Sequence, residues 1–506
     1  MTAETVRIQL EPLSVSVDVP RGALLSSTLV QHGVEFPCGG TGLCGGCRIR
    51  VLAGSLPVTD SDSIIFSSEE IAAGWRLACQ ARAEMPLVLG CSEWQMDILA
   101  DDSHLTGTGK AGLGIAIDLG TTTIAAQIID LATGNVLGVD TGLNPQAPFG
   151  SDVMQRIQAA RSGADLTTVI RLILGQMVAR LAMGREEEVR EVVLVGNTVM
   201  HHLFAGIDVE PLSHVPFQSP HPDAQFFESH SLGWKLPPDS RIRFERCLGG
   251  FVGSDILAGI MAVGMSRSDE LLALVDLGTN GEIAIGNRHR IVCASAAAGP
   301  AFEAGAIRMG MRAAPGAISR VWLSQGQMSA AVIGNIETRG ICGSGLVDAV
   351  AAGLALGRIL PSGRIADGTK LLPVQRPVVL TQSDIRELQL AKAAIASGFR
   401  LLLKRLGTSA AQLKGIFLAG AFGNYVQVES AVAIGLIEAP KGLIHAVGNT
   451  ALRGAKMLLL MSEDPALPGI EHVNLASDRE FQDQFADCMS FPRCEKMTSS
   501  AVPSRP

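Results

Sequence analysis

The chain opens with short runs in which apolar and polar residues alternate, and it continues with longer mixed segments. Residues 6–20 alternate in this way and predict two β-strands with a tight connection, while residues 21–34 predict a short helix. Residues 47–54 and 85–90 predict further strands. Residues 167–184 instead have the apolar spacing of an amphipathic helix that packs on a sheet. The pattern therefore predicts a small strand-rich N-terminal unit followed by a larger α/β region.

A second long helix is predicted over residues 381–407. Thr381 precedes Asp384 by three positions, which resembles a capping box with aspartate in place of glutamate or glutamine. Gly407 suits the position that follows the last turn of a helix. We expect this helix to be a core or inter-lobe element.

One motif occurs twice in the α/β region. Residues 114–130 and 273–286 each contain an apolar strand, then Asp-Leu-Gly-Thr, then a second strand. In this pattern the turn of a β-hairpin offers backbone amides and hydroxyls to phosphate oxygens. Asp118 and Asp276 are predicted to hold Mg²⁺ through water, because Mg²⁺ sheds its waters reluctantly. A single copy is a weak signal, since any strand that ends in an Asp-Gly turn shows it, but two framed copies predict a nucleotide site.

Three glycine-rich segments follow other predicted strands. Residues 415–426 fit the segment over which the adenosine passes in duplicated nucleotide folds, and residues 192–206 are a related element in the first half. Residues 340–350 place glycines at a predicted helix N-terminus, where free amides attract phosphate, although a purely structural turn is the alternative. Together these repeats resemble the actin, sugar kinase and Hsp70 superfamily, in which two RNase H-like lobes close on ATP.

The repeats assign roles to individual residues. The predicted catalytic residues are Asp118, Asp276 and Glu282. The predicted nucleotide-binding residues are Gly120, Thr121, Thr122, Gly278, Thr279, Asn280, Gly281, Gly343, Ser344, Gly345, Gly420, Ala421 and Gly423. Glu282 and Asp152 are candidates for positioning water, with a solvent-facing Glu282 and a helix N-cap at Asp152 as the alternatives. For the adjacent His201 and His202, a structural role is favoured over contact with a ligand.

Four cysteines near the N-terminus predict an iron–sulfur cluster. Cys38, Cys44 and Cys47 lie in the glycine-rich loop PCGGTGLCGGC, and Cys79 follows in RLACQ. Three thiolates at this spacing with a distant fourth suit a [2Fe–2S] cluster. The loop glycines allow the backbone to wrap the cluster and to bring amides close to its sulfides. With the surrounding strands, the unit is similar to a β-grasp ferredoxin of the adrenodoxin-like kind.

The alternatives for these cysteines are a zinc site and disulfides. Zinc sites usually pair two short-spaced knuckles, whereas the fourth cysteine here is alone. Disulfides need an oxidising compartment, and the N-terminal residues have no signal-peptide pattern. Spacing and glycine content therefore favour the cluster.

Composition sets the scale of the fold. At 506 residues the chain is expected to hold about three domains. The formal net charge of −8 argues against a nucleic-acid partner, and no apolar run reaches the ~18 residues that span a membrane, so we expect a cytoplasmic protein. The predicted divisions are a ferredoxin domain at 1–90, a flexible linker at 91–112, a first actin-like lobe at 113–270, a C-terminal ATPase lobe at 271–498 and a disordered tail at 499–506.

The motifs together resemble those of the reductive activators of corrinoid-dependent methyltransferases, the RACE proteins. The resemblance covers residues 3 to about 495 and rests on the strings PCGGTGLCGGC, DLGTTT, VGNTVMHHLFAG, DLGTNGEIAIG, CASAAAGPAFE, GICGSGLVD, SDIRELQLAKAAI, LAGAFGNYV and VGNTALRGA. It implies a [2Fe–2S] ferredoxin domain before duplicated lobes that bind ATP and Mg²⁺. It further implies ATP-dependent transfer of one electron to cob(II)alamin on a corrinoid protein, an unidentified electron donor and a homodimer.

Three other functions are compatible with the same parts. A small-molecule kinase with a fused ferredoxin would need a carboxylate base aimed at a substrate hydroxyl. An ATP-dependent activator of another low-potential enzyme, such as a 2-hydroxyacyl-CoA dehydratase, would usually bridge a [4Fe–4S] cluster across a dimer, and the cysteines here offer no pair for one. A non-enzymatic scaffold would turn over no ATP with any partner.

Overall fold

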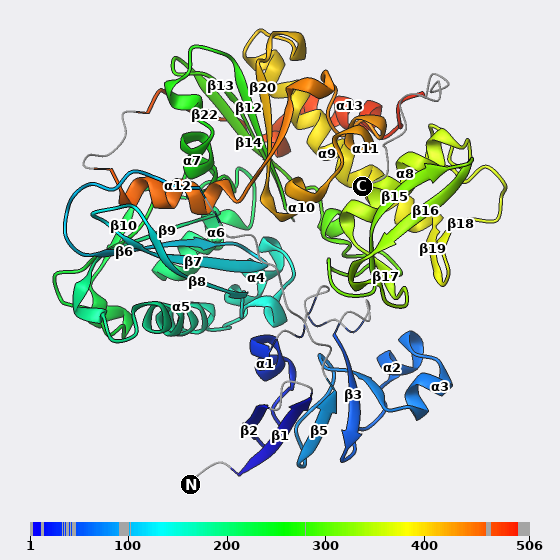
Figure 1. Cartoon of the computed structure of the whole chain (residues 1–506), viewed down its shortest axis with the longest axis horizontal. Helices are drawn as coiled ribbons and strands as arrows, with labels where there is room; N and C mark the ends of the chain where they lie inside the picture. The colour runs from blue at the N-terminus through cyan, green and yellow to red at the C-terminus, as the bar shows by residue number, and fades with distance from the viewer. Residues whose placement is uncertain are drawn as a thin grey trace.

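The protein consists of a small N-terminal module and two larger lobes, and its structure is a computed structural model (Figure 1). The residues that the structure describes are 4–11, 15–32, 34, 36, 40, 42, 47–90, 101, 103–278, 280–461 and 467–493. Cys38, Cys44, Thr279 and the predicted tail at 499–506 lie outside these residues. The N-terminal module, drawn in blue, lies below both lobes in the view of Figure 1.

The N-terminal module is built on a mixed sheet with the strand order β2-β1-β5-β3-β4. Its elements are β1 (Thr5–Glu11), β2 (Val15–Pro20), α1 (Ser26–Leu29), the 3-10 helix η1 (Val30–His32), β3 (Arg48–Ala53), α2 (Asp60–Ile65), α3 (Ser68–Ala72), β4 (Trp75–Leu77) and β5 (Leu87–Gly90). The alternation in residues 6–20 produces the antiparallel pair β1 and β2, and it buries Ile8 and Leu10 completely. Because β1 pairs in parallel with β5, the module has the predicted β-grasp arrangement.

The two lobes repeat one strand order. The first sheet runs β10-β11-β9-β6-β7-β8 and the second runs β21-β20-β12-β13-β14-β22. In each lobe three consecutive strands form an antiparallel meander, and a fourth strand, β9 or β20, joins the first strand of the meander in parallel. This shared order confirms the predicted duplication of an RNase H-like lobe.

The bounds of the elements follow the sequence patterns closely. The first lobe contains β6 (Leu113–Leu119), β7 (Thr123–Asp130), β8 (Val136–Leu143), the 3-10 helix η2 (Ala147–Phe149), α4 (Val153–Arg161), α5 (Leu166–Ala182), β9 (Val189–Gly196), α6 (Thr198–Ala205), β10 (Gln225–Phe227), β11 (Arg241–Phe244) and α7 (Ser254–Ala262). The second lobe contains β12 (Leu272–Leu277), β13 (Gly281–Gly286), β14 (Ile291–Ala296), the 3-10 helix η7 (Pro300–Glu303), β15 (Ala317–Ser324), β16 (Gln327–Val332), β17 (Gly340–Ile341), α8 (Gly343–Ala355), β18 (Leu371–Gln375), β19 (Val378–Thr381), α9 (Gln382–Arg405), β20 (Gly415–Ala419), α10 (Gly420–Tyr425), α11 (Val428–Ala433), β21 (Ile444–Gly448), α12 (Thr450–Leu459), β22 (Ile470–His472) and α13 (Arg479–Cys488).

The long helix α9 has the predicted ends. The Thr381 hydroxyl accepts a hydrogen bond from the Asp384 amide at 3.2 Å, and the Asp384 carboxylate accepts one from the Thr381 amide at 2.7 Å. Gly407 follows the helix with a φ of 67°. The capping box and the terminating glycine are therefore confirmed.

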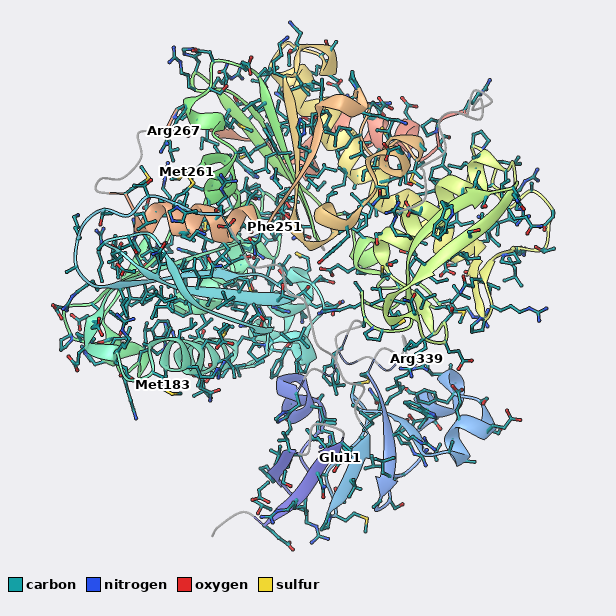
Figure 2. The ribbon with its side chains drawn as sticks, in the orientation of Figure 1. Glu11, Met183, Phe251, Met261, Arg267 and Arg339 are labelled. Carbon is teal, nitrogen blue, oxygen red and sulfur yellow. The ribbon has the colours of Figure 1, made fainter. Side chains whose placement is uncertain are left out.

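Two helices cross between the lobes. Helix α12 packs on β6 and β9 of the first sheet, although it follows β21 of the second lobe in the chain. Helix α7 leaves the first lobe and shares a core with Leu272 and Leu274 of β12. The two helices touch so closely that a Cβ on Gly454 would lie 2.2 Å from the carbonyl oxygen of Ala258. Figure 2 labels Met261 of α7, which packs at this junction between the lobes.

The ferredoxin-like module touches the first lobe through the end of β8 and the segment that follows. Leu143 and Ala147 pack against the core of the module, and η1 contacts β8. A Cβ on Gly40, in the cysteine loop, would lie 3.3 Å from the Pro148 carbonyl oxygen. The described part of that loop therefore faces the first lobe.

The second half of the predicted linker is hydrogen bonded to the first lobe. The Lys456 ammonium of α12 pairs with the Asp101 carboxylate at 2.5 Å and donates to the Ser103 carbonyl oxygen at 2.6 Å. Further along, the Thr108 amide donates to the Leu131 carbonyl oxygen at 2.8 Å. We call Asp101 and residues 103–112 the strap. Flexibility does not describe the strap, because its backbone is held at several points.

Within the described part of the chain, no helix combines the length and the apolar character that a membrane crossing requires.

Candidate functional site

The two predicted hairpins meet between the lobes. Asp118 lies near the end of β6 and Asp276 near the end of β12, the central strands of the two sheets. Burial raises the pKa of Asp118 to about 6. Burial, and then the neighbouring charge of Asp118, raise the pKa of Asp276 to about 7. The effect of the Asp118 charge on the pKa of Asp276 agrees with the two duplicated turns lying near each other, and we call the region around these two carboxylates the cleft.

Two further carboxylates join this pair. Asp255, the second residue of α7, has its pKa raised to about 8 by burial and then by the charge of Asp276. Glu282 is 7% exposed, so the solvent-facing alternative is wrong. Burial, Asp255 and Asp276 raise the pKa of Glu282 well above its usual value, and the Ser295 hydroxyl donates to its Oε1 at 3.2 Å. The cleft thus gathers four carboxylates that repel one another and lack full hydration.

This donor set fits a hydrated magnesium ion with a nucleotide. Carboxylate oxygens are the ligands that Mg²⁺ prefers, and a divalent cation would relieve the repulsion that raises these pKa values. Among the described residues, no three His, Cys, Asp or Glu side chains are close enough to coordinate an ion together. Contact of these carboxylates with Mg²⁺, including the expected contact through water, stays a prediction.

Two asparagines at equivalent positions of the repeat hydrogen bond to the first hairpin. Asn197 begins α6 and donates through Nδ2 to the Thr121 hydroxyl at 2.8 Å. Asn449 begins α12 and donates through Nδ2 to Oδ2 of Asp118 at 2.8 Å. Each asparagine also caps its own helix through Oδ1. Both asparagines lie in V-G-N-T strings, and the repetition of this string was the signal from which their role could have been predicted.

A buried arginine hydrogen bonds to the turn of the first hairpin and to the segments beside it. Arg156 of α4 is 1% exposed and donates to the Thr121 carbonyl oxygen, to the Gly150 carbonyl oxygen at 3.1 Å and to Oε1 of Gln146 at 3.2 Å. Asn144 adds a bond from Nδ2 to the Gly120 carbonyl oxygen at 2.8 Å. The turn of the hairpin is therefore fixed before any nucleotide binds. No motif around Arg156 predicted this role.

Nearby, the Asp152 carboxylate accepts from the Gln155 amide at 2.9 Å at the start of α4. The N-cap interpretation of Asp152 is therefore confirmed.

Across the cleft, the Thr122 hydroxyl donates to Oε1 of Glu303 at 3.3 Å, which links the first hairpin to η7 of the second lobe.

The adenosine-side segment begins next to Asp276. Gly420 has a φ of 82°, and a Cβ there would lie 2.5 Å from Oδ1 of Asp276. Only glycine fits this position without displacing the carboxylate. Ala421 and Gly423 follow within α10. Their contact with a nucleotide stays a prediction.

The remaining predicted nucleotide residues have structural contacts of their own. The Gly278 amide donates to the Asn280 carbonyl oxygen at 3.1 Å within the second turn. A Cβ on Gly281 would lie 1.6 Å from Ile395. A Cβ on Gly343 would lie 1.7 Å from the Phe302 carbonyl oxygen, and one on Gly345 would lie 2.2 Å from that of Ile318.

Close packing therefore accounts for Gly281, Gly343 and Gly345 without a ligand. The Ser344 hydroxyl likewise donates to the Ser319 carbonyl oxygen at 2.9 Å. At the start of α8 the structure favours the purely structural alternative that the sequence left open.

The two described cysteines of the predicted cluster lie close together in the N-terminal module. Cys47 is 1% exposed and Cys79 is 5% exposed. The Ala78 amide donates to the Cys47 carbonyl oxygen at 2.9 Å, so the strand ends that carry the two thiols are neighbours. Gln80 donates through Nε2 to the Gly40 carbonyl oxygen at 2.8 Å and lies 3.7 Å from the Cys79 sulfur. Buried adjacent thiols with a nearby amide donor fit a cluster whose potential is tuned by hydrogen bonds.

The histidine pair is structural, as favoured. His201 and His202 are fully buried in α6, and the His202 ring bonds to the Thr198 carbonyl oxygen at 2.8 Å and to the Ser219 hydroxyl. Burial lowers the pKa of His201 to about 3 and that of His202 to about 4.

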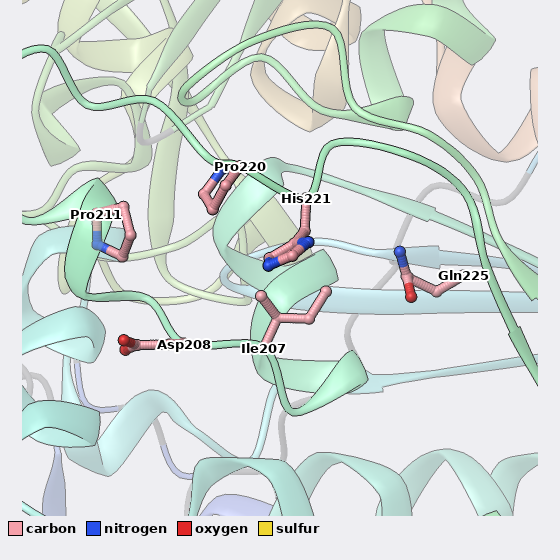
Figure 3. Close-up of a pocket in the computed structure, with 6 residues that line it drawn as sticks. All are labelled: Ile207, Asp208, Pro211, Pro220, His221 and Gln225. Atoms are coloured by element: carbon pink, nitrogen blue, oxygen red, sulfur yellow. The ribbon is translucent and has the colours of Figure 1, made fainter.

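A pocket of about 350 Å³ opens beside the segment that follows α6 (Figure 3). Its lining residues are Ile207, Asp208, Pro211, Pro220, His221 and Gln225. None of them belongs to the predicted nucleotide or cysteine sites, so this pocket is separate from the cleft.

The fold and the cleft define the class of protein: a ferredoxin module fused to a two-lobed ATPase of the actin type. Comparison with known families agrees with this. Residues 8–84 match the 2Fe-2S iron-sulfur cluster binding domain, residues 113–268 match the RACo middle region, and residues 270–502 match the C-terminal domain of RACo, the ASKHA domain. These matches support a [2Fe–2S] cluster in the module and ATP binding in the lobes.

Individual relatives are similar over most of the chain. The corrinoid activation enzyme RamQ of Eubacterium limosum is 30% identical over 95% of this chain and 98% of its own length. The [Co(II) methylated amine-specific corrinoid protein] reductase of Methanosarcina barkeri is 28% identical over 69% of this chain and 70% of its own. A solved reductive activator for corrinoid, iron-sulfur protein superposes with a TM-score of 0.66 at 25% identity over 96% of this chain and 98% of its own. The chain therefore belongs to the RACo family of corrinoid reductive activators.

Proposed function

We propose that this protein reactivates a corrinoid protein by ATP-dependent delivery of one electron, converting cob(II)alamin to cob(I)alamin. The observation that carries the proposal is the union of two sites in one chain: buried adjacent thiols in a ferredoxin module, and a carboxylate cleft between duplicated lobes. A relative that shares nearly the whole length is named as a corrinoid activation enzyme, and one that is similar over 69% of this chain is named as a corrinoid protein reductase. A kinase or an isolated ferredoxin would need only one of the two sites.

The residues of the module would hold the electron carrier. Cys38, Cys44, Cys47 and Cys79 are the proposed ligands of a [2Fe–2S] cluster, which when bound supplies one-electron transfer. Burial of Cys47 and Cys79 limits the access of water to the sulfur atoms. The amide of Gln80 lies 3.7 Å from the Cys79 sulfur and favours added negative charge there.

The residues of the cleft would hold the nucleotide. The hydroxyls and amides of the two hairpin turns are the proposed donors to phosphate, and Asp118 and Asp276 the proposed holders of hydrated Mg²⁺. Asn449 and Arg156 fix the first hairpin, so the donors are preorganised before binding. Glu282 and Asp255 keep raised pKa values until a cation enters, which makes nucleotide binding and proton release linked events.

ATP is needed because the electron moves uphill. Plant-type [2Fe–2S] centres have potentials near about −400 mV, and we expect the corrinoid couple to be more negative. Each 100 mV of gap costs ~2.3 kcal/mol for one electron. We infer that ATP offsets this gap by favouring a complex in which Co(II) loses an axial ligand, which raises the cobalt potential. Stoichiometric accumulation of a phosphorylated partner would contradict this part of the proposal.

A visible-spectrum assay tests the function. Reduced protein, ATP and a corrinoid protein loaded with cob(II)alamin are mixed without oxygen, and the cob(I) band is followed. We expect Cys79→Ser to abolish the band and to keep nucleotide binding, and Asp276→Asn to weaken nucleotide binding and to keep the cluster spectrum. Cys488→Ser, which alters a buried cysteine of α13 outside both sites, is the matched control. A cob(I) band of wild-type size in both site variants would refute the assignments.

We also propose that the chain forms a homodimer and that a separate protein reduces its cluster. The kinase alternative predicts ADP release that depends on a small hydroxylated substrate, and no observation in the described residues favours it over electron delivery.

A further inference from the structure

We propose that Lys456 is a positioning residue for electron transfer, because its ion pair with Asp101 fixes the strap on the first lobe and thereby limits the reach of the ferredoxin module. The meaning of this anchor for electron transfer rests on the proposed function. The anchor itself is a property of the chain alone, and it can be measured without cluster turnover, nucleotide or partner.

The anchor is buried and fully bonded. Lys456 has no exposed side-chain surface, and its ammonium pairs with the Asp101 carboxylate at 2.5 Å. The same ammonium donates to the Ser103 carbonyl oxygen at 2.6 Å and lies 3.4 Å from that of Asp101. Gln127 of β7 donates to the Asp101 carbonyl oxygen at 2.8 Å. A buried lysine needs such a set of acceptors, and all three of them come from Asp101 and Ser103 at the start of the strap.

The anchor matters because the module must move. In the observed arrangement Gly40 of the cysteine loop faces Pro148, and Leu143 and Ala147 pack against the core of the module. An electron acceptor on another protein can approach the described part of this loop only if the module leaves that contact. How far the module travels is then set by the chain between Gly90, where β5 ends, and the first fixed point of the strap.

The lengths can be worked out from the sequence. From Gly90 to Asp101 there are 101 − 90 = 11 residue steps, which span at most ~39 Å at ~3.5 Å per residue. If Asp101 and Ser103 are released together with the exposed contact of the His104 ring with Oδ1 of Asn135 at 3.2 Å, the next fixed point of the backbone is Gly107, whose amide bonds to the Thr133 carbonyl oxygen at 3.2 Å. From Gly90 to Gly107 there are 107 − 90 = 17 steps, or at most ~60 Å.

Release therefore adds ~20 Å of reach. It also lowers the effective concentration of the module at its docking face by about twofold, because this concentration falls roughly as the −3/2 power of tether length.

The position of Lys456 connects the anchor to the cleft. Lys456 lies on α12, seven residues after Asn449 (456 − 449 = 7), whose amide donates to Asp118. At ~1.5 Å of rise per residue, the nucleotide-site contact and the strap contact are about 10 Å apart on one rigid helix. The strap is thus bound to α12, the same helix whose first residue, Asn449, hydrogen bonds to the nucleotide-site carboxylate Asp118.

The test uses the full chain and two measurements. Lys456→Met keeps the length and apolar stem of the side chain and removes the charge, so the unpaired Asp101 carboxylate is expected to turn into water and release the strap. Hydrogen–deuterium exchange should then become at least tenfold faster at the amides of 103–106 and should stay unchanged in β6 and β9. Small-angle X-ray scattering should show a larger maximum dimension, by up to ~20 Å.

Three variants make the result specific. Lys456→Arg keeps a cation and should restore slow exchange in the strap, which a mere loss of packing would not predict. Lys404→Met removes a lysine from an exposed ion pair with Glu480 and should leave the strap and the scattering unchanged. If Lys456→Met does not fold, Asp101→Asn removes the other half of the pair, and the same local acceleration is expected.

The proposal would be overturned if folded Lys456→Met had the hydrogen-exchange rates and the maximum dimension of the wild type. If Lys456→Met does not fold, the same result in Asp101→Asn would overturn it. Either result would do so even if ATP-dependent reduction is established. A released strap in a protein that reduces no corrinoid would refute the proposed function and leave the anchor standing.

Discussion

The two V-G-N-T asparagines allow a matched test of the first hairpin. Asn449→Ser and Asn197→Ser both keep a good helix cap, since serine replaces asparagine well at that position. Both remove an amide donor that lies 2.8 Å from its acceptor. The acceptors differ: Asn449 bonds to the Asp118 carboxylate, whereas Asn197 bonds to the neutral hydroxyl of Thr121.

The difference in acceptor sets the expected magnitude. A hydrogen bond to a charged group contributes ~1.5–3 kcal/mol to stability and a neutral one ~0.5–1.5 kcal/mol. At pH 8 Asp118 is ionised, because its pKa is about 6. We therefore expect Asn449→Ser to lower the free energy of unfolding by ~1–2 kcal/mol more than Asn197→Ser does. At pH 5 Asp118 is largely protonated, so the gap between the variants should shrink.

Urea unfolding without nucleotide, followed by circular dichroism at pH 8 and pH 5, measures this gap. Because the two variants differ only at equivalent helix caps, slow or multistep unfolding affects both alike. An equal or larger effect of Asn197→Ser at pH 8, or a gap that widens at pH 5, would show that the charge of Asp118 does not control the contact. Asn449→Ser should also weaken ATP binding more than Asn197→Ser, as measured by calorimetry.

Two other predictions concern the histidine pair and the adenosine-side turn. His201 and His202 are neutral in the folded protein with pKa values of about 3 and 4, so unfolding takes up protons as the pH falls below the unfolded pKa near 6.5. The contribution of each neutral histidine to stability is therefore complete above pH 6.5 and falls by ~2 kcal/mol at pH 5, whereas the carboxylates with raised pKa values, such as Asp118 and Asp276, contribute with the opposite sign. Between pH 7 and pH 5, His201→Phe should therefore lose ~2 kcal/mol less stability than the wild type in urea unfolding, and an equal loss in both proteins would contradict the assignment. Gly420→Ala should cost ~2–3 kcal/mol and abolish nucleotide binding, because it adds a clash with Asp276 to the strain of a positive φ. Gly407→Ala, where φ is 67° and the space is open, should cost only ~1 kcal/mol; equal costs would mean that the clash is relieved elsewhere.

The fold was predictable from local patterns because its parts repeat. Strand–DLGT–strand units at Asp118 and Asp276 marked the two meanders, and the spacing of the cysteines marked the module. The capping box of α9 could be predicted because Thr381 and Asp384 lie within one helical turn. In each case the residues that interact are close in the chain.

The contacts that complete the site were not predictable in this way. Asp255 joins the carboxylates only because α7 crosses from the first lobe toward the second sheet. Asn449 reaches Asp118 across 331 positions, since α12 packs on the sheet of the other lobe. Lys456 and Asp101 are even further apart, at 355 positions. The polar sequence of the linker does not indicate that a buried lysine of a distant helix binds it.

The central claim is that ATP and a cluster in one chain together deliver an electron to cobalt. Its most direct measurement is the decay of the Co(II) electron paramagnetic resonance signal of a corrinoid protein in a single turnover, with chemically reduced protein in stoichiometric amount. The account predicts loss of the signal with ATP, matched by oxidation of an equal amount of cluster, and a stable signal without ATP or with Cys79→Ser. Equal loss of the signal with and without ATP would contradict it.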